Sequence, residues 1–406
     1  MGRVALADIK RADDRIDDED VVMTTPIEES RSLSRMAGAN VRLKMEHLQR
    51  TGSFKTRGAY NKLTQLAAEG YVEQVVAASA GNHAQGVALA ATKTGLDSTI
   101  VMPQTAPQTK INATASYGAE VVLEGNTFQE AVEHARTLAD ADRTAFIHAY
   151  DDPDIVAGQG TLGLEMYTQL PAVDTVIVPI GGGGLIGGIA TAIKSQDADI
   201  RIVGVQAEEA ATVPQSLKKG VPVDIDDPDT IADGIATGGI SELTLELIDE
   251  HVDEIVLVSD DEIANAMLIL LERAKQLVEG SGAASVAGLL SPDLDVTDEL
   301  VLPVLCGGNI DPSMLQIVLT YALTERDQLL DLQVRIDDEP GQMGMIAGLI
   351  GQEGANIRTV RHDRAVGDLH VGEAYLVFEV VTGGEEHAQR VIEAIESGGY
   401  EVSRVN

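Results

Sequence analysis

Short runs of β-branched residues alternate with longer amphipathic stretches along most of the chain, from about residue 40 onward. The run Val75 to Ala78, for example, is followed by the alanine-rich stretch His83 to Thr94. The same order recurs in Ser98 to Met102 with Gln108 to Tyr117, Glu120 to Leu123 with Thr127 to Asp140, and Thr175 to Ile180 with Leu185 to Ser195. Strands and helices in repeated alternation predict an α/β fold with parallel sheets and crossover helices.

The pattern changes after Arg326, where a different order of elements begins. Strands are predicted at Leu332 to Asp337, Asn356 to Arg361, Tyr375 to Val381 and Tyr400 to Val405, and helices at Gly341 to Gln352 and Glu385 to Ser397. This is the βαββαβ order of a ferredoxin-like module. We therefore expect two domains, residues 1–327 and residues 328–406.

Composition indicates a folded protein with an acidic surface. The chain has 406 residues, of which 44% are hydrophobic, and 65 acidic against 29 basic side chains give a formal net charge of −36. Nucleic acid is excluded as the main partner, because no Lys- or Arg-rich stretch offsets this acidic field. Only ten of the 29 basic residues are lysines, and such a surface is expected of a salt-adapted, halophilic organism.

Three features bear on the compartment and on membranes. Cys306 is the only cysteine, which excludes an internal disulfide and a cysteine-based zinc cluster. The acidic run Asp17 to Asp20 lies where a signal peptide would need a basic start and an apolar segment. Residues 175–193 are uncharged and nearly long enough to span a membrane, but Pro179 and six glycines favour a strand, a glycine loop and a helix. We expect a cytoplasmic protein with no membrane partner.

A run of four glycines separates the last apolar strand of this series from its helix: Gly181, Gly182, Gly183 and Gly184. Backbone amides in such a loop, together with the dipole of the following helix, form a cradle for a phosphate. Gly182, Gly184 and Gly187 also satisfy the dinucleotide-binding pattern, with Glu208 near the place of a ribose-binding acid. From the residues alone, the loop holds one of several phosphate ligands or is a tight turn without a ligand.

Lys55 stands at the predicted start of a helix, in the run Ser53-Phe54-Lys55-Thr56-Arg57-Gly58. Ser53 is placed to cap the N-terminus of that helix. A helix N-terminus and partial burial both disfavour an ammonium, so Lys55 is a candidate for a free amine that forms a Schiff base. The alternative is an ordinary solvated lysine.

A second candidate segment comes directly after the strand that ends at Ala78: Ser79, Ala80, Gly81, Asn82 and His83. Ligands of open α/β sheets bind in the crevice at the carboxyl ends of the strands. The backbone amides of this segment therefore predict a binding place for a substrate carboxylate. No second His, Asp or Glu stands at ligand spacing from His83. This favours a packed or loop-fixing histidine over a metal ligand, and we expect no metal site.

These three segments, in this order, resemble the fold type II pyridoxal-phosphate enzymes, and within them the threonine and serine dehydratase group. The resemblance extends over about residues 20–325 and includes four more motifs: Gly158-Gln159-Gly160-Thr161, Asp233-Gly234-Ile235-Ala236, Glu279-Gly280-Ser281-Gly282-Ala283 and Cys306-Gly307-Gly308-Asn309. It implies pyridoxal 5'-phosphate as the cofactor. It also implies two doubly wound parallel-sheet subdomains, the smaller one, about residues 45–147, being inserted into the larger. Beside this series of motifs the dinucleotide interpretation is set aside.

The resemblance also implies roles for single residues. Lys55 matches the lysine that forms the internal aldimine and then moves the Cα proton, and Phe54 packs on the cofactor ring. Asn82 matches the residue that bonds the phenolic oxygen of the cofactor, and the segment Gly181 to Leu185 matches the phosphate loop. Cys306 occupies the position that faces the pyridine nitrogen, where a thiol is only a weak donor.

The reaction implied is the dehydration and deamination of L-threonine to 2-oxobutanoate and ammonia, with L-serine to pyruvate as a secondary activity. A serine-preferring dehydratase and a β-replacement synthase share the same machinery and stay open, and a non-catalytic amino-acid sensor is a third alternative. Racemisation is disfavoured, because the serine racemases carry a serine where Ala80 stands. Their divalent-cation ligands are matched here by Gln206, Ala210 and Thr212, so we expect no magnesium at that place.

The C-terminal module resembles the ACT domain through Asp338-Glu339-Pro340-Gly341-Gln342-Met343 and Gly354-Ala355-Asn356-Ile357. In that family the turn before the first helix and the edge of a neighbouring module together bind an amino-acid effector, which implies Pro340, Gly341 and Asn356 as effector-binding residues. We expect a branched-chain amino acid there, and a homo-oligomer, either a dimer or a tetramer. A module that only adds an oligomer contact is the alternative.

Overall fold

A computed structural model of the chain describes residues 4–226, 228–364, 367 and 369–405. It divides into two compact units, Met1–Asp311 and Pro312–Asn406. The second unit opens with helix α13 (Pro312–Glu325), so the division lies ahead of the boundary near residue 328 that the sequence analysis predicts. This helix packs on β11 (Leu329–Asp337), the first strand of the C-terminal sheet.

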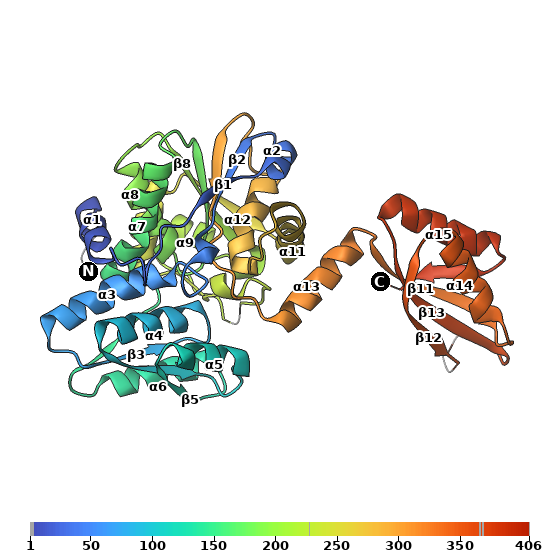
Figure 1. Cartoon of the computed structure of the whole chain (residues 1–406), viewed down its shortest axis with the longest axis horizontal. Coiled ribbons are helices and arrows are strands. Elements are labelled where there is room, and N and C mark those ends of the chain that lie inside the picture. The colour runs from blue at the N-terminus through green and yellow to red at the C-terminus, as the bar shows by residue number, and fades with distance from the viewer. Residues whose placement is uncertain (1–3, 227, 365–366, 368, 406) are drawn as a thin grey trace. The chain divides into compact units, whose positions relative to one another are not determined.

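The first unit contains a six-stranded sheet in the order β1-β2-β10-β7-β8-β9 (Figure 1). β1 runs antiparallel to β2, and the remaining neighbours are parallel. The strands are β1 (Ile27–Glu29), β2 (Asn40–Lys44), β7 (Thr175–Pro179), β8 (Arg201–Ala207), β9 (Glu254–Val258) and β10 (Leu300–Pro303). The uncharged stretch 175–193 is β7, the glycine loop and most of α8 (Gly184–Lys194), as the glycines and Pro179 predict.

Between β2 and β7 the chain forms a separate parallel sheet in the order β5-β4-β3-β6. Its strands are β3 (Gln74–Ala78), β4 (Asp97–Met102), β5 (Glu120–Leu123) and β6 (Thr144–Phe146). Successive residues of β3 pack into two different cores, Val75 with residues of α4 (Asn82–Thr94) and Val76 with residues of α6 (Phe128–Ala139). Helices therefore cover both faces of this sheet, as expected of parallel strands.

The other helices of the first unit are α1 (Leu6–Arg15), α2 (Arg31–Ala37), α3 (Lys55–Glu69), α5 (Gln108–Ser116), α7 (Pro153–Gln169), α9 (Val213–Lys219), α10 (Glu242–His251), α11 (Asp260–Ile269) and α12 (Gly280–Leu290). Figure 1 shows α3 beside α4, and α3 also packs on α7. A Cβ on Gly158 of α7 would lie 2.6 Å from the Cα of Gly58 and 2.8 Å from the carbonyl oxygen of Arg57. Glycine is therefore required for α3 and α7 to approach this closely, and the start of α3 is held at the seam between the two sheets.

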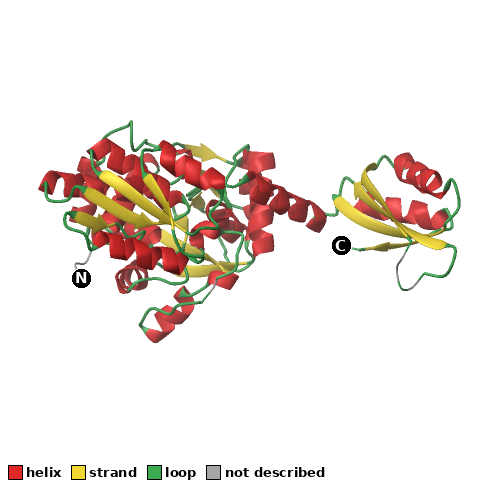
Figure 2. Cartoon of the chain, turned by 90° about the horizontal axis from the view of Figure 1, so that it is seen from below, coloured by secondary structure: helices red, strands yellow, loops and turns green. Residues whose placement is uncertain are grey.

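The second unit has an antiparallel sheet in the order β12-β13-β11-β14, which Figure 2 shows in yellow. Besides β11 it contains β12 (Asn356–Asp363), β13 (Glu373–Val381), β14 (Glu401–Arg404), α14 (Gln342–Gln352) and α15 (Glu385–Ser397). Burial alternates along β11, and its buried residues share one core with Ile346 of α14 and Val391 of α15. The strand order and the single helical layer are those of a ferredoxin-like fold.

The fold class predicted from the sequence is confirmed: two parallel-sheet subdomains are followed by a βαββαβ unit. Within the described ranges, none of the helices combines the length and the apolar character that a membrane crossing requires.

Candidate active site

Segments that follow the carboxyl ends of several strands converge on Lys55, the first residue of α3. Its Nζ donates a hydrogen bond to the carbonyl oxygen of Ala149, which follows β6, over 3.2 Å. The same Nζ lies 5.1 Å from the centroid of the Phe54 ring. Phe54 is fixed in turn, because its backbone N–H donates to the carbonyl oxygen of Cys306, after β10, over 3.2 Å. Residues from both sheets thus meet at one amine.

Burial lowers the pKa of Lys55 from 10.5 to about 8, although the nearby carboxylate of Glu279 opposes the shift. An amine with this pKa holds a substantial unprotonated fraction near neutral pH, and the unprotonated form is the nucleophile. The sequence analysis predicts this desolvated amine, and the structure supplies its physical cause.

Ser53 does not cap the helix, contrary to the prediction. α3 begins at Lys55 with Phe54 at the N-cap and without a side-chain cap. The backbone of Ser53 instead pairs with Gly307 in an antiparallel bridge. Its buried hydroxyl has no hydrogen-bond partner among the atoms that the structure describes.

The side-chain amide of Asn82, the first residue of α4, is oriented by two neighbours. Its Nδ2 donates to Glu279 Oε1 over 2.7 Å, and its Oδ1 accepts from Asn309 Nδ2 over 2.8 Å. A carboxylate accepts and an amide nitrogen donates, so these contacts fix which way the Asn82 amide points. One N–H of Asn82 Nδ2 is left for a ligand in the site.

Glu279 is a site residue for which the sequence analysis gave no role, although its motif was recognised. It lies at the N-cap of α12 and accepts hydrogen bonds from Asn82 Nδ2, Ser281 Oγ over 2.6 Å and the Asn309 backbone N–H over 3.1 Å. Burial raises its pKa, while these three donors lower it. Because Asn82 belongs to the smaller sheet's α4, Glu279 also links the two subdomains. The only indication of this role in the sequence is that Glu279 is a single acidic residue beside a run of small residues.

The glycine loop connects β7 to α8 beside the same site. Gly183 has a φ of +84°, in the left-handed region that favours glycine. A Cβ on Gly182 would collide with the ring of Tyr150, which comes from the segment after β6. Tyr150 is a neighbour of the site that could not be identified from the sequence, because its position along the chain gives no sign of this contact. The first amides of α8 have no partner within the helix, and such amides can bind an anion, so the glycine run stays a predicted phosphate loop.

The segment Ser79 to His83 forms a turn at the carboxyl end of β3. The backbone N–H of Gly81 donates to Ser79 Oγ over 3.1 Å, and Ala80 lies between them. His83 is buried, and its Nε2 lies 3.0 Å from the carbonyl oxygen of Ile147. Burial and the charge of Lys55 lower the pKa of His83 to about 3, so the neutral ring donates to that oxygen. His83 is a loop-fixing histidine, and the first amides of α4 stay available for a carboxylate.

Cys306 lies buried at the carboxyl end of β10. Its Sγ donates to the carbonyl oxygen of Ser281 over 3.5 Å. Burial raises the pKa of this thiol, and the charge of Glu279 adds to the effect. The thiol is therefore neutral, and its one proton already has an acceptor.

Comparisons with known proteins agree on one family. Residues 19–307 match the family described as "Pyridoxal-phosphate dependent enzyme". The L-threonine ammonia-lyase of Thermotoga maritima is 43% identical over 399 residues, 98% of this chain and 99% of that relative. The structure of processed threonine deaminase isoform 2 from Solanum lycopersicum aligns with a TM-score of 0.75 and 38% identity, covering 79% of this chain and 90% of that one. Maize serine racemase aligns with a TM-score of 0.74 and 32% identity, covering 80% and 99%.

The chain belongs to the pyridoxal-phosphate dependent enzymes. The residues of its site fit that cofactor, which carries an aldehyde, a phenolic oxygen, a ring nitrogen and a phosphate. An amine with a pKa of about 8 is suited to the aldehyde. A glycine loop before a buried helix is suited to the phosphate, and the oriented amide of Asn82 to the phenolic oxygen.

The predicted effector residues are not brought together within one C-terminal unit. Asn356 pairs with Val381 and, through it, lies at the Leu329 end of β11. Gly341 follows the opposite end of that strand, at the N-cap of α14. The nine residues of β11 span about 26 Å from first to last, at roughly 3.3 Å per step. One unit therefore cannot form a small site from both ends.

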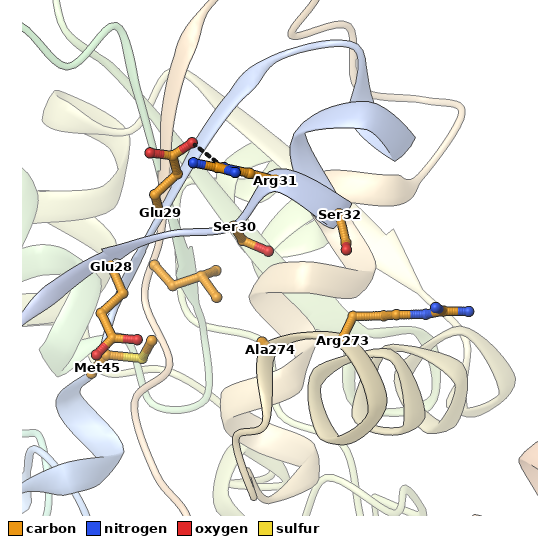
Figure 3. A pocket seen from close by; sticks show the side chains of 9 residues that line it. Glu28, Glu29, Ser30, Arg31, Ser32, Met45, Arg273 and Ala274 are labelled. Atoms are coloured by element: carbon orange, nitrogen blue, oxygen red, sulfur yellow. Dashed lines mark ion pairs between the residues drawn. The ribbon is translucent and has the colours of Figure 1, made fainter.

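A separate pocket of about 390 Å³ lies in the first unit, between the β1–α2 connection and Arg273 and Ala274. Figure 3 shows Arg31 turned towards Glu29 and the side chains of Ser30, Ser32 and Arg273 around the opening. None of the predicted site residues lines it, so this pocket is distinct from the Lys55 site.

Among the residues that the structure describes, no group of three or more His, Cys, Asp or Glu side chains is placed to hold a metal ion. At the place matched to the racemase cation ligands, Gln206 Oε1 accepts from the backbone N–H of Val213 over 2.9 Å.

We expect the attachment of pyridoxal phosphate to the apoprotein to quicken as the pH rises and to level off above about pH 8, because the pKa of Lys55 is lowered to about 8 and only the free amine attacks an aldehyde. The measurement is the rate of change in visible absorbance after mixing, across the neutral to alkaline range. A midpoint at the ordinary lysine pKa of 10.5 would show that Lys55 is not desolvated.

Proposed function

We propose that this chain is a pyridoxal-phosphate dependent L-threonine ammonia-lyase, which converts L-threonine to 2-oxobutanoate and ammonia and L-serine to pyruvate more slowly. The observation that carries the proposal is the desolvated amine of Lys55 beside the glycine loop and the Asn82–Glu279 pair. The substrate assignment is supported by the similarity to the Thermotoga maritima L-threonine ammonia-lyase over nearly the whole of both chains.

When bound, pyridoxal phosphate supplies the electron sink that makes the Cα proton of an amino acid acidic. Lys55 would hold the cofactor covalently at rest, and its free amine would take the Cα proton of the substrate. A pKa of about 8 suits both tasks, since the amine is neither fully protonated nor a weak base near neutral pH. Loss of the β-hydroxyl as water, followed by hydrolysis, gives the keto acid and ammonia.

The other residues of the site would bind the cofactor and the substrate and orient them. Gly181 to Leu185 would hold the phosphate through their backbone amides, and Phe54 would pack on the ring. The free N–H of Asn82 would donate to the phenolic oxygen, with Glu279 and Asn309 keeping the amide in that orientation. The amides of the segment Ser79 to His83 would hold the substrate carboxylate.

Cys306 would face the ring nitrogen without protonating it strongly, because its thiol is neutral and donates to Ser281. An unprotonated ring nitrogen makes the cofactor a weaker electron sink, which favours elimination over reactions that need a long-lived carbanion. This supports a lyase over a transaminase.

A serine-preferring dehydratase and a β-replacement synthase use the same residues and differ only in what the pocket around the β-carbon accepts. Racemisation has a specific observation against it. Ala80 offers no hydroxyl at the position where we expect the acid and base of a racemase for the second face of Cα.

The C-terminal unit is proposed to be an ACT-type regulatory module that binds a branched-chain amino acid through Pro340, Gly341 and Asn356 in a homo-oligomer. Because Gly341 and Asn356 lie at opposite ends of the sheet in one unit, the effector would bind where two units from different subunits meet. Such a catalytic and regulated chain is proposed to work in the cytoplasm.

Lys55→Ala is expected to lower the rate of threonine dehydration by at least roughly 10³-fold, because both the covalent attachment and the base are lost. Cofactor binding measured by equilibrium dialysis should persist in part through the glycine loop. Lys55→Arg is the matched control, since it keeps a cation but cannot attach the aldehyde and should be equally inactive. Normal dehydration by either variant would overturn the assignment of Lys55.

Ala80→Ser is expected to raise the rate of D-serine formation from L-serine, because the new hydroxyl supplies a proton donor on the second face. Chiral chromatography of the products, together with a pyruvate assay, separates racemisation from elimination. Ala80→Gly changes the size of the residue without adding a hydroxyl and should not racemise. A wild-type chain that formed D-serine as fast as pyruvate would contradict the role given to Ala80.

Isoleucine or valine is expected to shift the threonine response of the full chain by roughly 5- to 150-fold, the usual range of coupling between sites. Asn356→Ala should remove most of that shift and leave basal turnover unchanged. Thr359→Ala, an exposed position on the same strand β12, is the control. If neither amino acid changes the wild-type response, the unit only adds an oligomer contact.

A further inference from the structure

Arg57 is among the largest fully buried side chains of the protein, and the mechanism above does not use it. Its side chain is 2% exposed. Its Nε donates to Glu46 Oε1 over 2.6 Å and its Nη2 to Glu46 Oε2 over 3.1 Å, a forked pair with one carboxylate. The same Nη2 donates to Glu165 Oε2 over 2.7 Å, and Nη1 donates to Thr161 Oγ1 over 3.3 Å.

Lys44 completes a cluster of four charged side chains, in which Lys44, Glu46 and Arg57 are buried and Glu165 is 14% exposed. Its Nζ donates to Glu165 Oε1, to the carbonyl oxygen of Thr25 over 2.6 Å and to Gln169 Oε1 over 2.8 Å. Burial alone would raise the pKa of Glu165, but Arg57 and Lys44 together lower it. Burial lowers the pKa of Lys44, and the charges of Glu165 and Glu46 oppose that shift. The cluster joins the end of β2, the turn that follows, α3 and α7.

This cluster lies on the side of α3 opposite to Lys55. An α-helix turns about 100° per residue, so Lys55 and Arg57 point about 200° apart. The neighbours are held as well: Thr56 Oγ1 lies 2.7 Å from Thr51 Oγ1, and the backbone N–H of Gly58 donates to Gln159 Oε1 over 3.2 Å. Arg57 thus fixes the first turn of α3 from the side of the helix opposite to the Lys55 amine.

We propose that Arg57, through Glu46 and Glu165, is a positioning residue that sets the rotation of the first turn of α3 and thereby the place of the Lys55 Nζ. The inference rests on the proposed function of Lys55 as the cofactor lysine. Arg57 touches neither substrate nor cofactor. A displacement of about 1 Å at a reacting group can cost roughly 10²-fold in rate, so a loosened turn would reach the chemistry.

Arg57→Lys tests the proposal, because it keeps the charge but cannot reach Glu46 with two nitrogens and Glu165 at the same time. The matched control is Arg201→Lys. Arg201, at the start of β8, also donates to several acceptors, with Nη2 to Glu299 Oε2 over 3.0 Å and to the carbonyl oxygen of Asp295 over 2.8 Å. Arg201 lies at the amino end of β8, whereas Lys55 lies at the carboxyl ends of the parallel strands.

Six quantities are measured on both variants and on the wild type. They are the thermal midpoint, the pH midpoint and the rate of pyridoxal phosphate attachment to the apoprotein, the fraction of Lys55 labelled after borohydride reduction, and kcat and KM for threonine. Arg57→Lys should slow attachment, shift its pH midpoint and lower kcat by roughly 10- to 100-fold, with little change in KM. Arg201→Lys should lower only the thermal midpoint.

Wild-type attachment and kcat in Arg57→Lys, or equal losses of kcat in the two variants at equal thermal midpoints, would overturn the proposal. Should Arg57→Lys fail to fold, Glu165→Gln replaces it, since the amide keeps the shape and one acceptor oxygen, and the same attachment defect is required of it. The attachment measurements use no substrate. A wild type that attaches the cofactor but does not dehydrate threonine would therefore refute the proposed function alone.

Discussion

The site in the first unit depends on one constraint, which is the removal of the Lys55 amine from water. Desolvation lowers its pKa to about 8, and its hydrogen bond goes to a neutral carbonyl, that of Ala149. Two residues further along, Arg57 is 2% exposed, more deeply buried than Lys55, and lies between two carboxylates. Burial without a paired carboxylate makes it easier for Lys55 to lose its proton, whereas the two carboxylates around Arg57 hold that cation in place. Opposite sides of the first turn of one helix thus carry a reactive lysine and an anchoring arginine.

Glu279 shows how the site keeps a carboxylate close to that amine without pairing the two. Its oxygens accept from the side chains of Asn82 and Ser281 and from the backbone of Asn309, so its lone pairs are used by neutral donors. The charge of Glu279 still opposes the lowering of the Lys55 pKa. The carboxylate therefore orients the Asn82 amide and joins the two subdomains while Lys55 stays a usable nucleophile.

Much of the fold and the location of the site could be predicted from the sequence, because strand and helix alternation, the glycine run and the lysine at a helix start are local patterns. Contacts between segments that lie far apart in the sequence could not be predicted in this way. The Arg57 cluster needs Glu165, which is 108 residues away, and nothing in the spacing marks it. The Ser53 prediction failed for the same reason, since a local capping pattern was overridden by pairing of its backbone with Gly307.

The register of the C-terminal sheet connects regulation to assembly. Asn356 and Gly341 lie at opposite ends of a nine-residue strand, so a ligand the size of an amino acid cannot touch both in one chain. If both bind the effector, each subunit supplies a different half of the site, and a two-fold pair of units completes two identical sites at once. Effector binding would then stabilise the assembly by mass action, and the assembly would in turn set the effector affinity. Effector binding and subunit association would then be coupled parts of one equilibrium.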